Sequence, residues 1–254
     1  SLIAPFLVAP SAEAATYVKT IYASKDTFAF EGYPNNNYGG WSMFYAGIHQ
    51  NGYRYRAYIY FPLSGIPSNA IIVSAYLKLT LKTKYYLTTQ QRLWVMAVKD
   101  PWSESTLTWN NQPSRSYDGP GSYGSYANFI VQSSDTAGKT YTISLKTLVE
   151  KWVSGAKANR GIALLGTSGL TGVVVFYSSE EATKNYRPKL VVTYKVPLIH
   201  VSVTPSTVKV NQGGSVTLQV KVTPSDYTGS VTLGISGLPS GASYSFNPPS
   251  GSGS

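Results

Sequence analysis

The chain of 254 residues contains no cysteine, two histidines and only 13% charged residues. Without cysteine, disulfide bonds and thiolate metal sites cannot form, so packing and hydrogen bonding must hold the fold. His49 and His200 are too far apart in the sequence to form an HxxxH or HxH metal-binding pair. No apolar run is long enough to span a bilayer, so we expect no membrane span.

Catalytic motifs are also missing. The sequence has no GxSxG elbow, P-loop or GxGxxG stretch. The one adjacent pair of carboxylates, Glu180-Glu181, is interpreted as a solvated loop tip or a partner of Arg187. We therefore expect no catalytic residue here, and any catalytic domain would lie outside these residues.

The positive charge is concentrated in one part of the chain. Residues 16–196 contain 19 Lys and Arg against 9 Asp and Glu, which accounts for the whole formal charge of +10. Residues 197–254 contain two Lys and one Asp and are nearly neutral. A basic, tyrosine-rich domain attracts polyanions. Because no nucleic-acid recognition motif is present and the start of the chain suggests export, we expect no nucleic acid as a partner.

The first fifteen residues resemble the end of an export signal. An apolar run from Leu2 to Val8 precedes Ala12-Glu13-Ala14, which has the small-x-small form of a signal-peptidase site. We interpret residues 1–15 as a signal-peptide remnant, and expect a secreted, extracellular or cell-surface protein. A short ordered N-terminal strand is the alternative.

Residues 16–196 show the period-two alternation of β-strands. Turn residues separate the segments 54–61, 75–82, 92–98, 161–166, 172–178 and 189–194. A single helix is expected at 144–155, where Leu145, Leu148, Val149 and Trp152 follow helical spacing and Gly155 ends it. The pattern predicts an all-β, jelly-roll-like β-sandwich with one short helix.

Residues 197–254 predict a second, incomplete immunoglobulin-like β-sandwich. Short alternating strands are joined by Pro and Gly turns, but only four or five strands are present before the chain reads SGSGS. Together with the signal-like start, this suggests a fragment of a larger protein. Donation of the missing strand by a neighbouring subunit is the alternative, which would imply self-assembly.

Five motifs in register carry a family resemblance over residues 17–195. They are SKDTFAFEGYPNNNYG, RAYIYFPLSGIPSNAIIVSAYLKLTL, DPWSESTLTWNNQP, LKTLVEKWVSGAKANRGIALLG and FYSSEEATKNYRPKLVVTY. In this order they resemble the DNRLRE-type domain, a β-sandwich module related to carbohydrate-binding module family 96. The resemblance implies polysaccharide binding, including acidic polymers. Pro62 replaces the acidic residue usual in this family, so a role of that acid in metal binding or strand pairing is not expected here. GLPSGASYSFNPPSG resembles a repeat of extracellular Ig-like modules.

Two tryptophans, Trp102 and Trp109, lie in a polar loop. They could plug the apolar core or form a platform for a sugar ring. The first interpretation is favoured because the residues around them are turn formers whose side chains satisfy backbone groups. A structural Ca²⁺ is possible, with Asp26 and the NNNYG stretch at 35–39 as oxygen ligands, although a plain turn explains that stretch too.

The candidate binding face consists of alternate residues on two predicted strands. Arginine forks can pair with uronate carboxylates and tyrosine rings can stack on pyranose rings. We expect Arg54, Arg56, Tyr58, Tyr60, Lys78 and Lys82 to point outward. The sequence thus favours a non-catalytic extracellular module for acidic, uronate-containing polysaccharide. The alternative is a structural or adhesive subunit of an envelope, matrix or filament.

Overall fold

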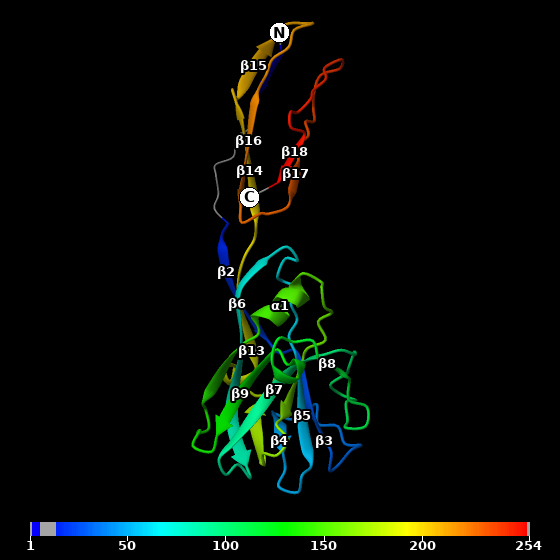
Figure 1. The fold of residues 1–254 in the computed structure, drawn as a ribbon, viewed down its shortest axis with the longest axis vertical. Coiled ribbons are helices and arrows are strands. Elements are labelled where there is room, and N and C mark those ends of the chain that lie inside the picture. Colours follow the sequence, from blue (N-terminus) through cyan, green and yellow to red (C-terminus); the bar gives the residue numbers. More distant parts are fainter. Residues whose placement is uncertain (1, 6–13, 253–254) are drawn as a thin grey trace. The chain divides into compact units, whose positions relative to one another are not determined.

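The computed structural model describes residues 2–5 and 14–252 (Figure 1). The signal-peptidase motif at Ala12-Glu13-Ala14 lies mostly outside these residues. The chain forms two compact units, one of residues 17–194, named here the sandwich unit, and one of residues 1–16 with 195–254, named here the terminal unit. Within the described part of the chain, no helix is long and apolar enough to cross a membrane.

The sandwich unit is built almost entirely from strands. In chain order these are β2 (Thr16–Tyr22), β3 (Lys25–Phe30), β4 (Met43–Ile48), β5 (Arg54–Tyr60), β6 (Ile71–Tyr85), β7 (Gln90–Val98), β8 (Arg115–Ser116), β9 (Ala127–Gln132), β10 (Thr140–Ser144), β11 (Ile162–Gly166), β12 (Gly172–Tyr177) and β13 (Lys189–Lys195). Helix α1 (Lys146–Val153) and two 3₁₀ turns, Ser122–Gly124 and Lys184–Tyr186, complete it. The predicted all-β sandwich with one helix is confirmed.

The strands form one curled sheet. Its path is β2-β13-β6-β12-β4-β5-β11-β7-β8, with β10 added to β6, β3 to β5 and β9 to β7. Strand β6 is long enough to pair with β10 through Tyr76–Thr80 and with β12 through Leu81–Tyr85. A register shift at Val175/Phe176 interrupts the second pairing. The bulge accompanies the curl that lets the sheet enclose a core.

Alternation along β6 supplies the main core. Leu77, Leu79 and Leu81 are fully buried, and the rings of Phe44 and Phe176 pack at a tilt with their centroids 5.7 Å apart. Helix α1 closes one part of this core, and its buried side chains are Leu148, Val149, Trp152 and Val153. The helix is tied to β6 because the Leu145 backbone N–H donates to the Ala75 carbonyl at 2.8 Å.

Close approach of β4 and β12 requires glycine. Gly47 has φ +127°, and a β-carbon there would overlap the Gly172 carbonyl oxygen. The two residues lie beside each other at the end of the β4–β12 ladder, where Gly47 pairs with Val173. Only glycine tolerates this combination of backbone angle and crowding.

The terminal unit contains three two-stranded sheets. They pair β1 (Leu2–Pro5) with β15 (Thr207–Val210), β14 (Leu198–Thr204) with β16 (Gln219–Ser225), and β17 (Ser230–Thr232) with β18 (Ser250–Ser252). No described side chain from 197 onward is buried. The strands predicted here are present, whereas a sandwich core is not seen among the described residues. The interpretation of residues 1–15 as a signal-peptide remnant stays a prediction.

Asp135 fixes the turn between β9 and β10. Its carboxylate accepts hydrogen bonds from Lys139 Nζ (2.5 Å), the Tyr141 hydroxyl (2.5 Å) and the Gln132 backbone N–H (2.9 Å). Burial alone would raise the pKa of Asp135, but the three donors outweigh it and lower the pKa to about 2. In the unfolded chain an aspartate titrates near 3.9, so the folded protein prefers the ionised form.

This lowered pKa makes the contribution of Asp135 depend on pH. Because the folded pKa lies below the unfolded one, the stabilisation is complete above about pH 4 and is lost as the pH falls through about 2. We expect Asp135→Asn to lower the free energy of unfolding by about 1 kcal/mol at pH 7, after screening by solvent. Urea unfolding at pH 7, 4 and 2 should show this difference shrinking towards zero. A difference that is equal at all three values would contradict the assignment.

Candidate functional site

The outer face of β5 is covered by residues 99–114, which join β7 to β8 and are named here the cover loop. Beneath it lies an apolar cluster separate from the main core. Its buried members are Ala29, Tyr58, Met96, Val98, Leu107 and Ala163, and Trp94, Trp102, Trp109 and Leu165 pack against them. The interpretation of Trp102 and Trp109 as plugs agrees with this packing, although they cover a sheet face.

Gln112 anchors the cover loop to β5. Its Oε1 accepts hydrogen bonds from Arg56 Nη1 at 2.9 Å and from the Tyr58 hydroxyl at 2.8 Å. Its Nε2 donates to the Trp109 carbonyl at 2.8 Å. Arg115 Nη1 donates to the Tyr58 hydroxyl at 3.3 Å. Burial raises the pKa of Tyr58, which remains a neutral donor to the amide oxygen.

Arg56 carries a charge that no carboxylate neutralises among the described residues. Its guanidinium carbon lies 4.4 Å from the centre of the Trp109 ring, a cation–π stack. Burial, followed by the like charge of Arg115, lowers the pKa of Arg56, although a guanidinium stays protonated in proteins. No described Asp or Glu lies within ion-pair distance of it. Arg56 is therefore a pre-positioned hydrogen-bond donor for an anionic ligand.

Arg54, two residues away, is already paired. Its Nε donates to Glu31 Oε2 at 2.9 Å and its Nη2 donates to Glu31 Oε1 at 2.5 Å, a bidentate fork. The hydrogen bonds from Arg54 are the largest cause that lowers the pKa of Glu31. The pair is largely exposed on the arginine side, so a competing carboxylate can reach the same donors.

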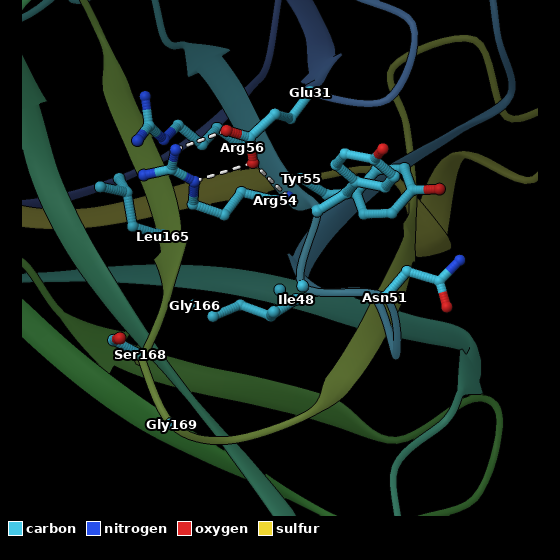
Figure 2. A pocket seen from close by; sticks show the side chains of 13 residues that line it. Glu31, Ile48, Asn51, Arg54, Tyr55, Arg56, Leu165, Gly166, Ser168 and Gly169 are labelled. Atoms are coloured by element: carbon cyan, nitrogen blue, oxygen red, sulfur yellow. Dashed lines mark hydrogen bonds and ion pairs between the residues drawn. The ribbon is translucent and has the colours of Figure 1, made fainter.

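A groove of about 660 Å³ brings these charges together (Figure 2). Its walls come from the end of β4, the β4–β5 turn, the start of β5, the end of β11 and the β11–β12 loop. The lining residues are Glu31, Gly47, Ile48, Asn51, Gly52, Tyr53, Arg54, Tyr55, Arg56, Leu165, Gly166, Ser168 and Gly169. Glu31, Arg54 and Arg56 leave the groove with one net positive charge.

An aromatic recess of about 190 Å³ shares one lining residue, Tyr55, with the groove. It is lined by Tyr45, His49, Tyr55, Tyr85, Tyr86 and Val173. Tyr45 stacks on Tyr55 at 5.5 Å and on Tyr85 at 6.4 Å between ring centroids. Burial raises the pKa of Tyr55 to about 12. Tyr85 and Tyr86 are both 45% exposed, so rings suited to stacking on sugars remain accessible.

The outward placement of Tyr58 was wrong. Its ring is fully buried under the cover loop, because a second layer of side chains covers the middle of β5 on the face that alternation assigns to solvent. Tyr60 is half-buried, with Lys25 Nζ 5.0 Å from the centre of its ring. Of the predicted residues of β5, only Arg54 and Arg56 reach the groove.

Lys78 and Lys82 do not lie on a strand adjacent to the one that carries Arg54 and Arg56. They lie on β6, and strands β12 and β4 stand between β6 and β5 in the sheet. Lys82 Nζ lies 4.0 Å from Glu181 and 5.0 Å from the centre of the Tyr177 ring. The six predicted residues therefore divide between two strands and form no single face.

Three carboxylates from separate segments meet at the start of β3. Oxygen atoms of Asp26, Glu104 and Glu180 lie within 4.8 Å of one another. Burial and then the neighbouring Glu180 raise the pKa of Asp26 well above its usual value. Glu180 was interpreted as a solvated loop tip or a partner of Arg187. It is exposed, in agreement with the first interpretation, and it also lies beside Asp26. Arg187 instead donates from Nε to the Glu181 backbone carbonyl at 2.5 Å.

The expected oxygen ligands at 35–39 have other partners. Asn35 Oδ1 accepts from Asn110, and Asn37 Oδ1 accepts from the Gly39 N–H. Asn37 Nδ2 donates to the carbonyls of Glu104 and Leu107, at 2.7 and 2.8 Å. This stretch ties down the cover loop.

Sequence reasoning missed most of the aromatic recess. Tyr45, Tyr85 and Tyr86 come from different strand ends, and no local pattern joins them. The adjacent Tyr85-Tyr86 pair could have indicated an exposed aromatic site, because neighbouring residues of a strand point to opposite faces and both rings cannot face one core. Tyr86 also has φ +56°, an uncommon backbone angle for a tyrosine.

The curled all-β fold, its charged groove and its accessible tyrosines define a β-sandwich binding domain. Residues 17–194 match the model of carbohydrate-binding module family 96, and the chain belongs to this family. The predicted resemblance is confirmed over the sandwich unit. Membership makes a carbohydrate the class of ligand for this unit.

A curated relative is described as a gellan lyase from Bacillus sp.. It is 28% identical over 205 residues, which cover 79% of this chain but 8% of the relative. The chain thus spans a small part of that protein's length, and the match concerns a segment of it.

Trp109 offers a test of structure against ligand binding. We expect Trp109→Ala to lower the free energy of unfolding by roughly 2–4 kcal/mol, because it uncovers the Tyr58 cluster and removes the ring under Arg56. Trp109→Phe should recover most of the loss, and Tyr123→Ala, at a ring 77% exposed, should change little. Urea denaturation measures all three. Unchanged stability in Trp109→Ala would show that the ring is not a plug.

Proposed function

We propose that the sandwich unit is a non-catalytic, extracellular module that binds acidic, uronate-containing polysaccharide in the groove at Arg54 and Arg56. The observation that carries the proposal is the guanidinium of Arg56, which forms no ion pair with a described carboxylate, in a groove that shares Tyr55 with a recess of accessible tyrosines. Family membership supports a carbohydrate ligand, and the positive charge of the groove supports an acidic carbohydrate. The relative described as a gellan lyase makes gellan a reasonable polymer to test.

Recognition in this groove would use two kinds of contact. A uronate carboxylate would accept hydrogen bonds from Arg56, whose Nη1 donates to Gln112 while no hydrogen bond to another described residue engages its other N–H groups. A neighbouring pyranose ring would stack on the tyrosines of the recess, which shares Tyr55 with the groove. The formal charge of +10 would speed the approach of a polyanion, and salt would weaken this steering.

The alternative is a structural or adhesive subunit. It is favoured by the terminal unit, where apolar side chains such as Ile199 and Val201 are 41% and 43% exposed. Such strands are covered when they pair with further strands, which a second chain could supply. Sedimentation of the 254-residue chain over a range of concentrations separates this role from simple binding, since it requires concentration-dependent assembly.

Affinity electrophoresis tests the proposed function directly. We expect alginate, pectate or gellan in the gel to retard the protein, while a neutral glucan does not. Arg56→Ala should weaken binding by about 10-fold or more, the loss of one charge-assisted contact of roughly 1.5–3 kcal/mol. Arg56→Lys should recover little, because an ammonium lacks the planar fork.

Matched controls locate the binding face. Lys146→Ala removes the same charge from α1, away from the groove, and should bind normally. Lys78→Ala removes a positive charge from β6. If this variant lost binding while Arg56→Ala did not, the binding site would be assigned to β6 instead of the groove. Retardation by none of the polymers would reject the proposal. Thermal unfolding of each variant shows whether a loss reflects misfolding.

A further inference from the structure

The cluster of Asp26, Glu104 and Glu180 is not part of the groove. Asp26 is the second residue of β3, Glu104 lies in the cover loop, and Glu180 follows β12. Three segments distant in the sequence therefore bring three negative charges to one place. Without a cation, such convergence opposes folding, because like charges repel and burial disfavours each charge.

Asp26 is the central member of the cluster. It is 1% exposed, and its Oδ2 accepts from the Ser179 backbone N–H at 2.7 Å. Its Oδ1 is buried and has no hydrogen-bond partner among the described residues. A buried carboxylate oxygen is costly to leave unpaired, and here its neighbours within reach are two more carboxylates, which cannot donate when ionised.

The other two carboxylates also keep one oxygen uncommitted. Glu104 Oε1 accepts from the Asp26 backbone N–H at 2.6 Å, and Glu180 Oε1 accepts from the Ser179 hydroxyl at 2.8 Å. No hydrogen bond of the described residues engages the second oxygen of either side chain. In each of the three side chains, one carboxylate oxygen accepts a hydrogen bond and the second has no hydrogen-bond partner among the described residues. The second oxygens could therefore bind a cation.

The spacing fits a large, hard cation. Oxygen ligands of Ca²⁺ lie at roughly 2.3–2.6 Å, so two of them can be separated by up to about 5 Å across the ion. The three carboxylate oxygens lie within 4.8 Å of one another. A dication would reduce three charges to one, and Lys25, whose charge acts on Glu104, offsets the remainder. Mg²⁺ requires shorter bonds in a strict octahedron, which separate segments provide less readily.

We propose that Asp26, Glu104 and Glu180 bind one Ca²⁺ ion, which fastens the cover loop and the loop after β12 to the start of β3. The remaining ligands are waters, because the three carboxylates supply fewer than the six to eight oxygens that Ca²⁺ takes. Since the cover loop carries Trp102 and Trp109, the ion stabilises the outer layer of the sheet. The proposal does not depend on the ligand of the groove.

The direct test is calcium titration of the EDTA-treated 254-residue protein by isothermal calorimetry, with thermal unfolding alongside. We expect one Ca²⁺ per chain, a rise in Tm with Ca²⁺ and a smaller rise with Mg²⁺. Glu180→Gln is the first variant, because Glu180 is exposed and its loss leaves the fold intact. It should weaken Ca²⁺ binding by at least about 10-fold. Glu181→Gln, the adjacent carboxylate outside the cluster, should bind as the wild type does.

A second variant distinguishes a metal site from a purely structural cluster. Asp26→Asn removes one of the converging charges, so in EDTA its Tm should equal or exceed that of the wild type, while in Ca²⁺ the order should reverse. No heat and no Tm shift at millimolar Ca²⁺ would overturn the proposal. Equal weakening by Glu180→Gln and Glu181→Gln would also overturn it, since it would indicate attraction to surface charge. Equal binding of Mg²⁺ would reject the assignment to calcium.

Discussion

The outer layer of the sandwich depends on the side chain of Gln112. Its one amide oxygen accepts from both Arg56 and Tyr58, while its amide nitrogen returns to the backbone of Trp109. These bonds hold the cover loop over a face of the sheet where Tyr58 of β5 and Met96 and Val98 of β7 would otherwise be exposed. They also orient Arg56, whose guanidinium lies on the Trp109 ring at one wall of the groove. Packing and ligand chemistry therefore share the same few atoms.

The strands and helix of the sandwich unit could be predicted because alternation and helical spacing are local. Leu77, Leu79 and Leu81 face the core as their spacing predicts, and α1 buries Leu148 and Trp152. The family likeness could also be read from motifs in register. Such features depend on residues close in the sequence, so a single chain reveals them.

The site was only partly predictable, because it depends on which segments cover which face. Alternation placed Tyr58 opposite Ile59, and it could not show that the cover loop would bury the second face as well. The grouping of Tyr45 with Tyr85, and of Asp26 with Glu104 and Glu180, arises from strand order and loop path. No spacing rule relates positions so far apart. Arg54 and Arg56 could be grouped from the sequence because they lie on one strand, and their role in binding stays a prediction.

The pairing of Arg54 with Glu31 has a consequence for selectivity. The groove already contains a tethered carboxylate, held in place at a high effective concentration. A free monosaccharide acid would have to displace this internal competitor with a single contact. A polymer held at Arg56 as proposed would present its next carboxylate nearby, so it would exchange with Glu31 within one complex. The groove would thus respond to chain length, and would discriminate an intact polysaccharide from the fragments left after its degradation.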